Sequence, residues 1–207
     1  LEHDQTMLDS LAQQADFLSQ DLERHLLGNH LFVNAKALIF AGCFFEGREA
    51  DKWLKTGLSI YNNELIEQVL PDGGNYELTA MYHVIMLVDL LDLLNLFYAY
   101  PSKVSTSVIE LTKSVALKML VWLERMSHND NRISFFNDSA FGIAPDNDVV
   151  FGYAKSLDLT WKSDDLTKLQ VHDLVDTGYV SVKNSELDGM IHYRDLNWSE
   201  KDSELEK

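Results

Sequence analysis

Apolar residues recur every three or four positions in long segments of this chain, and this period limits the folds open to it more than any other feature. Segments with that spacing cover residues 4–27, 30–45, 50–70, 80–98 and 104–126. Each is long enough for four or more helical turns. The chain has only three prolines and ten glycines in 207 residues, and several of them stand between the segments. The sequence therefore predicts a mainly α protein built from long helices.

The predicted helices differ in how much of their circumference is apolar. Residues 30–45 are apolar on nearly every side, and residues 80–98 are similar, which is typical of helices buried inside a protein. The other segments carry one apolar face, as outer helices do. Alternating outer and inner helices joined by short turns indicate an α/α toroid or solenoid of helical hairpins. A simple helical bundle fits the same periodicity.

The pattern changes in the C-terminal part of the chain. Residues 145–157 predict a short helix, and apolar and polar residues then alternate at 179–182 and 190–193. Alternation with a period of two predicts two short strands. The charged segment 199–207 is expected to be frayed.

The charge balance excludes several classes of partner. Seventeen basic and thirty-three acidic residues give a net charge of −16. Such a charge repels nucleic acids and anionic membrane surfaces, so we expect neither as a partner. Many of the basic residues of the helical part gather between positions 24 and 55, namely Arg24, Lys36, Arg48, Lys52 and Lys55.

Other features bear on the cellular context. Polar residues interrupt the most apolar run, residues 81–100, so we expect no insertion into a membrane. A single cysteine, Cys43, excludes an internal disulfide and a cysteine-based zinc site. Residues 1–26 have neither the basic nor the apolar region of a signal peptide. Because the chain opens at Leu1 instead of methionine, we expect it to be a fragment.

Several motifs follow one another in a family-specific order. They are Gly28-Asn29-His30 with the residues up to Leu38, Glu64-Leu65-Ile66-Glu67-Gln68-Val69-Leu70-Pro71-Asp72-Gly73-Gly74, Met81-Tyr82-His83, and Phe135-Phe136-Asn137-Asp138-Ser139-Ala140-Phe141-Gly142-Ile143-Ala144-Pro145. From about residue 22 to about residue 182 the chain resembles the N-terminal toroid domain of heparinase II/III-like polysaccharide lyases. The resemblance implies an incomplete α/α toroid over residues 1–160, and over 161–207 a linker with the opening strands of a truncated β-sandwich domain.

The resemblance implies an enzyme that cleaves an acidic polysaccharide, such as a glycosaminoglycan, by β-elimination at a uronic acid. The reaction needs a group that neutralises the uronate carboxylate, a base that removes the C5 proton and an acid that protonates the departing oxygen. In the family an asparagine, often with an adjacent histidine, meets the carboxylate, and a tyrosine serves as acid or base. Asn29, His30 and Tyr82 match those positions in this chain.

The positions of these residues suit an anionic substrate. Asn29 and Tyr82 each stand at the start of a predicted inner helix, where free N–H groups and the positive end of the helix dipole face a ligand. A tyrosine base also needs positive charge nearby to lower its pKa, for which His83, His30, Arg24 and Arg48 are candidates. His83 and Arg24 are also expected to bind the substrate.

The turn after the second predicted outer helix is a further candidate for substrate binding. It would bring Asn75, Tyr76 and Glu77 to the cleft, although the preceding Asp72-Gly73-Gly74 is expected to be a structural turn.

The chain departs from the family in two ways. Family members often have a histidine after the paired glycines, where this chain has Asn75. In the family a histidine-containing motif early in the β-sandwich supplies another active-site histidine and sometimes a metal site, and no such motif precedes Lys207; the lone His192 is not assigned this role. We therefore expect no cofactor and no metal ligand in this chain, which would hold half of the site. The resemblance suggests a periplasmic or secreted protein.

Each assignment has a structural alternative. Asn29 could serve only as an N-cap, His30 as a hydrogen-bonded buried histidine, and Tyr82 as a core residue. The chain as a whole could be a non-catalytic glycan-binding or scaffold module. Asp89 and Asp92 have the DxxD spacing of magnesium–diphosphate enzymes, which gives a third and weaker interpretation.

Overall fold

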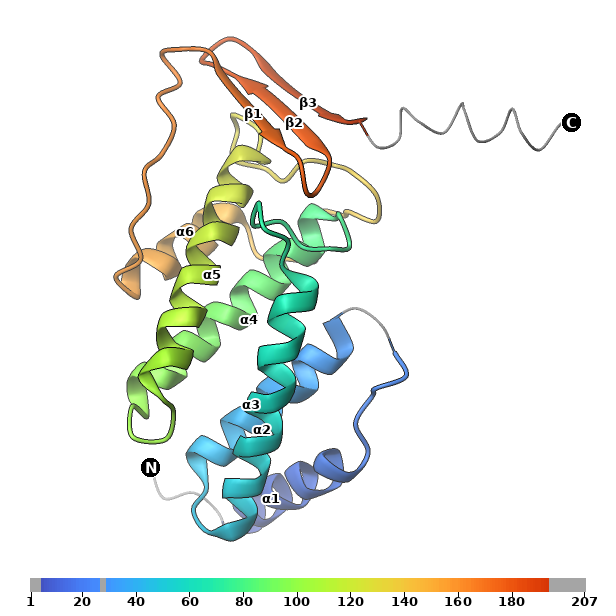
Figure 1. Ribbon diagram of the computed structural model, residues 1–207, viewed down its shortest axis with the longest axis vertical. Coiled ribbons are helices and arrows are strands. Elements are labelled where there is room, and N and C mark those ends of the chain that lie inside the picture. Colours follow the sequence, from blue (N-terminus) through green and yellow to red (C-terminus); the bar gives the residue numbers. More distant parts are fainter. Residues whose placement is uncertain (1–4, 27–28, 194–207) are drawn as a thin grey trace, which may run out of the picture. The chain divides into compact units, whose positions relative to one another are not determined.

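The computed structural model describes residues 5–26 and 29–193 (Figure 1). Gly28, expected to stop the first helix, and the charged tail 199–207 lie outside the described residues. The prediction of a mainly α chain with late strands is confirmed. The helices are α1 (Gln5–Gln20), α2 (Asn29–Phe44), α3 (Arg48–Gln68), α4 (Ala80–Ala99), α5 (Thr106–Arg125) and α6 (Asn147–Ser156), and the strands are β1 (Gln170–Leu174), β2 (Tyr179–Lys183) and β3 (Asp188–His192).

The first helix is shorter than its apolar periodicity predicts, since α1 ends at Gln20 instead of near residue 27. An asparagine of the next helix explains the difference. The Asn34 side chain accepts a hydrogen bond from the Glu23 backbone N–H at 3.0 Å and donates one to the Glu23 carboxylate at 3.0 Å. Because a side chain of α2 satisfies this N–H, the helical ladder does not continue through residues 21–26.

The chain forms two compact units. Unit 1 comprises residues 1–68 and 88–114, and unit 2 comprises residues 69–87 and 115–207. Helices α1, α2 and α3 belong to unit 1, while α6 and the strands belong to unit 2. Helices α4 and α5 each contribute one part to each unit. The domain boundary expected near residue 160 stays a prediction.

Two glycines let α2 and α3 approach closely in unit 1. A Cβ atom on Gly42 would lie 2.6 Å from the Leu54 Cβ, and one on Gly57 would lie 2.9 Å from the Ala35 carbonyl oxygen. The two helices therefore pack with their backbones close together. Beside this contact, the buried Tyr61 hydroxyl meets the Thr112 Oγ1 at 2.6 Å.

Helix α2 is less enclosed than its composition predicts. Its buried face contains Phe32, Leu38 and Ile39, but Val33, Phe40 and Phe44 are 42%, 38% and 46% exposed. The last two of these line a hollow of about 1170 Å³ in unit 1, which we call the apolar groove. Its other large apolar side chains are Met7, Leu8, Leu11, Phe17, Leu18, Phe45, Leu96 and Tyr100.

Helix α4 is the buried apolar helix that the sequence predicts. It is long and apolar enough to cross a membrane, but 67% of its most apolar window is buried inside the protein. Core helices can have the same length and composition, and α4 has the burial of a core helix.

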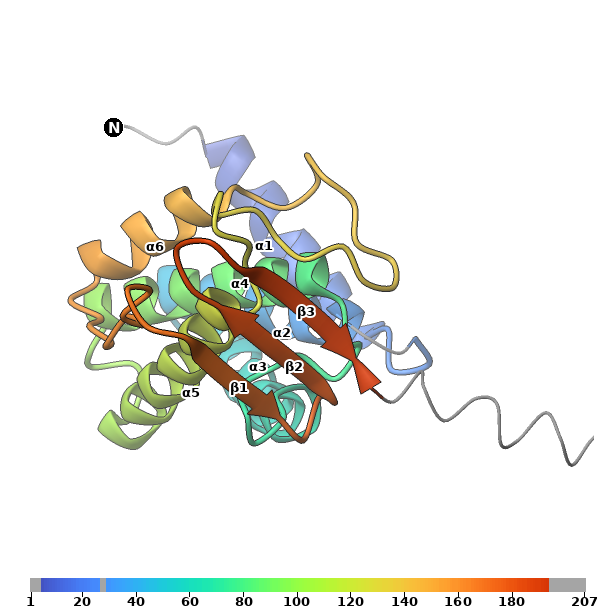
Figure 2. The ribbon, with the colours of Figure 1, turned by 90° about the horizontal axis from the view of Figure 1, so that it is seen from above.

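The strands form one antiparallel sheet in unit 2, in the order β1-β2-β3 (Figure 2). Strands β2 and β3 confirm the two predicted strands, whereas β1 was not predicted. Its sequence, Gln-Val-His-Asp-Leu, buries only Leu174, so it lacks the strong alternation of β2, where Tyr179, Ser181 and Lys183 are buried. Tertiary pairing with β2 makes it a strand.

The sheet shares a core with the end of α5. Trp122, Met126, Leu174 and Tyr179 form one buried cluster. The buried Lys183 ammonium donates to the Glu124 carbonyl at 2.9 Å and to the Ser127 carbonyl at 2.6 Å, which satisfies carbonyls at the C-terminus of α5. Burial lowers the pKa of Lys183, although Asp188, Asp164 and Glu124 act against this.

Candidate active site

Asn29 and His30 occupy the first turn of α2, in unit 1. Asn29 is half-buried, and His30 is exposed, with its Nδ1 3.7 Å from a Glu23 carboxylate oxygen. The alternative that His30 is a buried histidine is therefore wrong. Both side chains lie where the first N–H groups of the helix are free of intrahelical partners.

Tyr82 occupies the first turn of α4, in unit 2, and is half-buried. No described residue forms a hydrogen bond with its hydroxyl. A partly accessible tyrosine at a helix N-terminus with a free hydroxyl can exchange a proton with a ligand. The position is thus compatible with an acid or base, and the hydroxyl has no structural partner in the described chain.

The backbone just before α4 is held by residues far along the chain. Leu78 has a φ of 56°, which is uncommon for a residue with a side chain. Its carbonyl oxygen accepts hydrogen bonds from the Tyr179 hydroxyl at 2.6 Å and from the Asn137 amide at 2.6 Å. These two donors, from β2 and from the loop after α5, fix the entry into the turn that carries Tyr82.

The turn over residues 71–75 is the structural turn that the sequence predicts. The Asp72 carboxylate accepts from the Gly74 N–H at 3.0 Å, from the Thr177 N–H at 2.8 Å and from the Thr177 hydroxyl at 2.9 Å. Gly73 has a φ of 96°, and a Cβ on Gly74 would lie 2.2 Å from the Thr177 Cγ2. Both glycines are thus required, one by conformation and one by contact.

His83 is a core residue. It is completely buried, its Nε2 lies 3.0 Å from the Met119 carbonyl oxygen, and its ring centre lies 4.3 Å from that of Trp122. Burial lowers the pKa of His83 to about 4, although the bond to Met119 acts in the opposite direction. The expected contact with substrate does not occur in this structure, because the side chain has no exposed surface and is neutral near pH 7.

The three residues that follow the paired glycines differ in burial. Asn75 is 2% exposed; its amide donates to the Met86 sulfur at 3.3 Å and its oxygen accepts from the Glu77 N–H at 2.9 Å. Asn75 therefore shapes the turn and does not face a ligand. Tyr76 and Glu77 are half-buried in unit 2.

The other residue expected to bind substrate, Arg24, is exposed in unit 1.

The DxxD pair does not form a metal site. The Lys36 ammonium lies 2.7 Å from an Asp89 oxygen and 2.5 Å from an Asp92 oxygen. Burial lowers the pKa of Lys36, but its bonds to the two carboxylates outweigh this and raise it. An ammonium thus occupies the place between the carboxylates, and across residues 5–26 and 29–193 no cluster of three or more acidic, histidine or cysteine side chains is placed to hold a metal.

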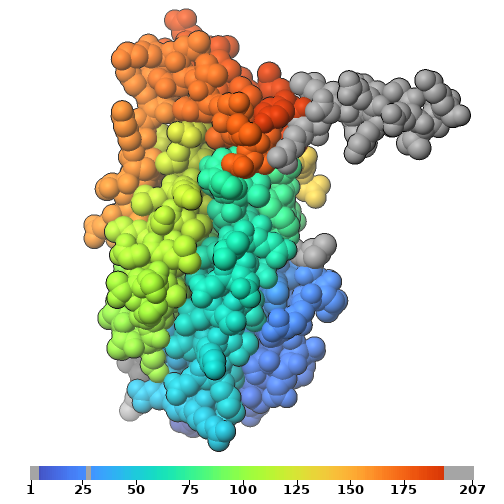
Figure 3. All heavy atoms as spheres, viewed as in Figure 1, coloured from blue at the N-terminus to red at the C-terminus, as the bar shows by residue number. Residues whose placement is uncertain are grey.

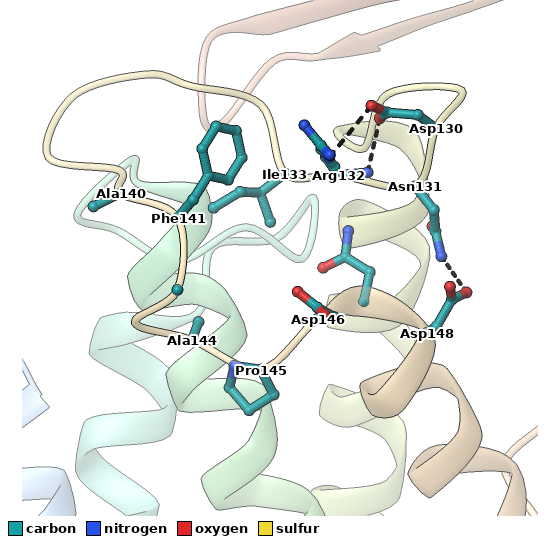
Figure 4. Close-up of a pocket in the computed structure, with 12 residues that line it drawn as sticks. Asp130, Asn131, Arg132, Ile133, Ala140, Phe141, Ala144, Pro145, Asp146 and Asp148 are labelled. Carbon is teal, nitrogen blue, oxygen red and sulfur yellow. Dashed lines mark hydrogen bonds and ion pairs between the residues drawn. The ribbon is translucent and has the colours of Figure 1, made fainter.

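A polar hollow that the sequence analysis did not predict as a site lies in unit 2 (Figure 4). It measures about 260 Å³ and is walled by the loops at residues 130–133 and 140–148. Arg132 pairs with Asp130 at 3.5 Å, and its guanidinium carbon lies 5.9 Å from the Phe141 ring centre. Asp146 precedes α6 but makes no capping hydrogen bond through its side chain. Part of the second loop belongs to the motif that ends at Pro145, and the other signal was a loop rich in Asp and Asn, which is common in turns.

The comparisons with known proteins agree with one another. The family model described as Heparinase II/III N-terminus matches residues 2–160. The heparin-sulfate lyase of Pedobacter heparinus is 41% identical over 78 residues, which are 37% of this chain and 12% of that protein. The heparin-sulfate lyase of Bacteroides thetaiotaomicron is 33% identical over 140 residues, 65% of this chain and 20% of that protein.

Solved structures show the same fold. A crystal structure of heparinase III has a TM-score of 0.67 at 23% identity and covers 87% of this chain and 30% of that chain. The crystal structure of heparan sulfate lyase HepC from Pedobacter heparinus has a TM-score of 0.61 at 23% identity and covers 85% of this chain and 29% of that one. This likeness confirms the toroid class over the simple bundle.

The chain spans between 12% and 20% of the length of these curated relatives. The family model, however, covers most of the chain and includes both helix starts described above. The chain therefore belongs to the heparinase II/III N-terminus family.

Proposed function

We propose that this chain is the helical part of a polysaccharide lyase that cleaves a sulfated, uronic-acid-containing polysaccharide by β-elimination. Membership of the family supports the reaction class. The relatives whose printed name is heparin-sulfate lyase support a sulfated glycosaminoglycan as the substrate.

In this proposal Asn29 and His30 neutralise the uronate carboxylate. The Asn29 amide and the His30 imidazole can donate hydrogen bonds, and the free N–H groups and the dipole of α2 add positive potential at the same helix end. Neutralising the carboxylate makes the C5 proton more acidic, because charge develops there as the proton leaves.

Tyr82 transfers the proton in this proposal. The observation that carries the assignment is its hydroxyl, which has no partner in the described chain although the backbone before it is firmly held. His83 supplies no positive charge beside this tyrosine near pH 7, because burial lowers the pKa of His83 to about 4. The positive end of α4 is the local source of stabilisation for a phenolate. Side chains carry this chemistry, so the proposal needs no cofactor held by this chain.

An assay for the unsaturated uronate product tests the proposal. The chain alone, and the chain joined to the C-terminal remainder of the Bacteroides thetaiotaomicron relative, would be incubated with heparan sulfate, hyaluronan and alginate. We expect the ultraviolet absorbance of the product to rise with heparan sulfate for the joined protein. Turnover that is unchanged in Tyr82→Phe would contradict the assignment of Tyr82.

The same assay separates a lyase from a glycan-binding module. Binding of heparan sulfate by the joined protein without any product, at every pH tested, would favour the non-catalytic alternative and overturn the proposal.

A further inference from the structure

A second polar hollow lies on the exposed face of α3, in unit 1. It measures about 460 Å³, and we call it the basic groove. Its polar lining consists of Arg24, Lys52, Lys55, Thr56, Ser59 and Asn63, with the buried Ile60 as the apolar part of the lining. The outer surface of α3, drawn in cyan to teal, is open on the face shown in Figure 3.

The charge of the basic groove is opposite to that of the protein. The chain carries a net charge of −16, yet three side chains lining this groove are cationic and none is acidic. Lys52 shares its charge with Glu49, at 2.8 and 2.9 Å. Arg24 and Lys55 form no ion pair with any described residue. Two unpaired cations beside one hollow create a local positive potential. At about 0.15 M salt, acidic side chains more than about 8 Å away are screened, so they do not cancel this potential.

The lining follows one face of the helix. Positions 52, 55, 59 and 63 follow one another at intervals of three or four residues, and position 56 lies three before 59, so these side chains form a stripe along α3. At about 1.5 Å per residue the stripe is roughly 16 Å long. Hydroxyl and amide groups at Thr56, Ser59 and Asn63 can donate hydrogen bonds to anionic oxygens between the cations. The groove thus offers several contacts in a row, as an extended polyanion requires.

We propose that the basic groove binds the sulfate and carboxylate groups of an acidic polysaccharide chain, as a binding site additional to Asn29, His30 and Tyr82. The identity of the ligand rests on the proposed function. The groove has no aromatic side chain on which a nucleic-acid base could stack, and the overall charge opposes nucleic acid. A flexible polysaccharide bearing separated charges fits a short positive stripe on an acidic protein.

Direct binding tests this inference without any turnover. The probe is a fluorescent heparan sulfate oligosaccharide of defined length, and the readout is its anisotropy with the full chain at low and at physiological salt. The double variant Arg24→Glu/Lys55→Glu should weaken binding about tenfold or more, because it removes two attractive charges, each worth up to about fivefold, and adds two that repel the polyanion. Arg24→Lys/Lys55→Arg should bind within about threefold of the native chain.

The matched control is Arg48→Glu. Arg48 is exposed on the same helix but does not line the groove, so this variant reverses one charge outside the groove, the change that Lys55→Glu makes inside it. It should bind within about twofold of the native chain, because a single exposed charge outside the site contributes little. Circular dichroism would confirm that the variants fold. An equal loss in Arg48→Glu, or no loss in the double variant, would overturn the inference.

Two further arms separate this inference from the proposed function and from another ligand class. Tyr82→Phe should bind the probe as the native chain does. Binding at the basic groove can therefore be confirmed even if the lyase assay shows no turnover. A single-stranded oligonucleotide of equal charge should bind at least about tenfold more weakly than the oligosaccharide. Equal binding of the two probes would show a non-selective anion site and would overturn the polysaccharide assignment.

Discussion

The N-terminus of α2 and the N-terminus of α4 carry residues of one proposed reaction, but they are built differently. Around α2, His30 is exposed, and its nearest ion-pair partner, Glu23, lies on the chain directly before the helix. Around α4, the preceding backbone is held by Tyr179, which is 101 residues away, and the turn before it by Thr177, which is 105 residues from Asp72. The first site depends on local sequence, whereas the second depends on the strands.

The largest effect should come from the proton-transferring group at α4. Tyr82→Phe should lower the rate of elimination by the joined protein about a hundredfold to ten-thousandfold, the usual loss when an acid or base is removed. Stability should stay the same, because the lost hydroxyl has no described partner. Product absorbance and urea unfolding measure the two quantities. Tyr98→Phe, an exposed tyrosine at the other end of α4, is the control and should keep full activity.

The next effect should come from the buried histidine at the start of α4, through the pH dependence of stability. Unfolded chain binds a proton at His83 with the ordinary pKa of 6.5, while folded chain binds it only near pH 4. The contribution of His83 to stability is therefore full above pH 6.5 and is lost as the pH falls towards 4. His83→Gln should remove this loss, which amounts to about 3 kcal/mol.

Urea unfolding at a series of pH values measures this difference between native and variant chains. The control is Gly152→Ala in α6, which removes no titratable group and should leave the slope against pH equal to that of the native chain. If His83→Gln and the native chain lose stability in parallel below pH 6.5, His83 is not buried as described.

A smaller effect is expected from the glycine contact before α4. Gly74→Ala would place a methyl group 2.2 Å from the Thr177 Cγ2 and 2.6 Å from the Trp122 Nε1. We expect a loss of about 1–3 kcal/mol in the free energy of unfolding, as for other overpacked sites. Gly152→Ala in α6, where nothing lies within 4 Å, should instead gain up to about 1 kcal/mol. Equal results for the two variants would show that residue 74 is not tightly packed.

The smallest effect should come from Tyr179→Phe. The Leu78 carbonyl keeps its bond from Asn137, so the change removes the bond from the Tyr179 hydroxyl to Leu78 and the long 3.5 Å bond that this hydroxyl accepts from Asn137, at a cost of about 1 kcal/mol. Thermal unfolding of this variant can be compared with that of Tyr193→Phe, whose hydroxyl makes a longer contact of 3.3 Å to the Val175 carbonyl. We expect the second variant to be nearly neutral. A larger loss in Tyr193→Phe would reverse the ranking.

The sequence predicted the parts of this molecule that depend on local pattern. Apolar spacing located the long helices, and the paired glycines located the turn before α4. The periodicity of this helix also separates Tyr82 from His83. Positions 83, 87, 90 and 94 form the completely buried stripe of α4, while 82, 85, 89 and 92 form a half-buried one.

The sequence could not predict what tertiary contacts decide. The early end of α1 follows from the Asn34 amide on a neighbouring helix, and β1 follows from pairing with β2. The left-handed backbone at Leu78 is stabilised by two donors from distant segments. The DxxD spacing suggested a magnesium site, but Lys36 of another helix lies between the two carboxylates, a contact that the spacing alone does not reveal.

The carbonyl oxygen of Leu78 accepts from two side chains that come from different segments. The two donors are redundant during evolution, because either Asn137 or Tyr179 can be replaced while the other still donates to the oxygen. Replacing both leaves a polar group without a partner and costs more than the sum of the single changes. Homologous chains should therefore lose one of the two donors far more often than both. Once one donor has been lost, the other position should tolerate few substitutions.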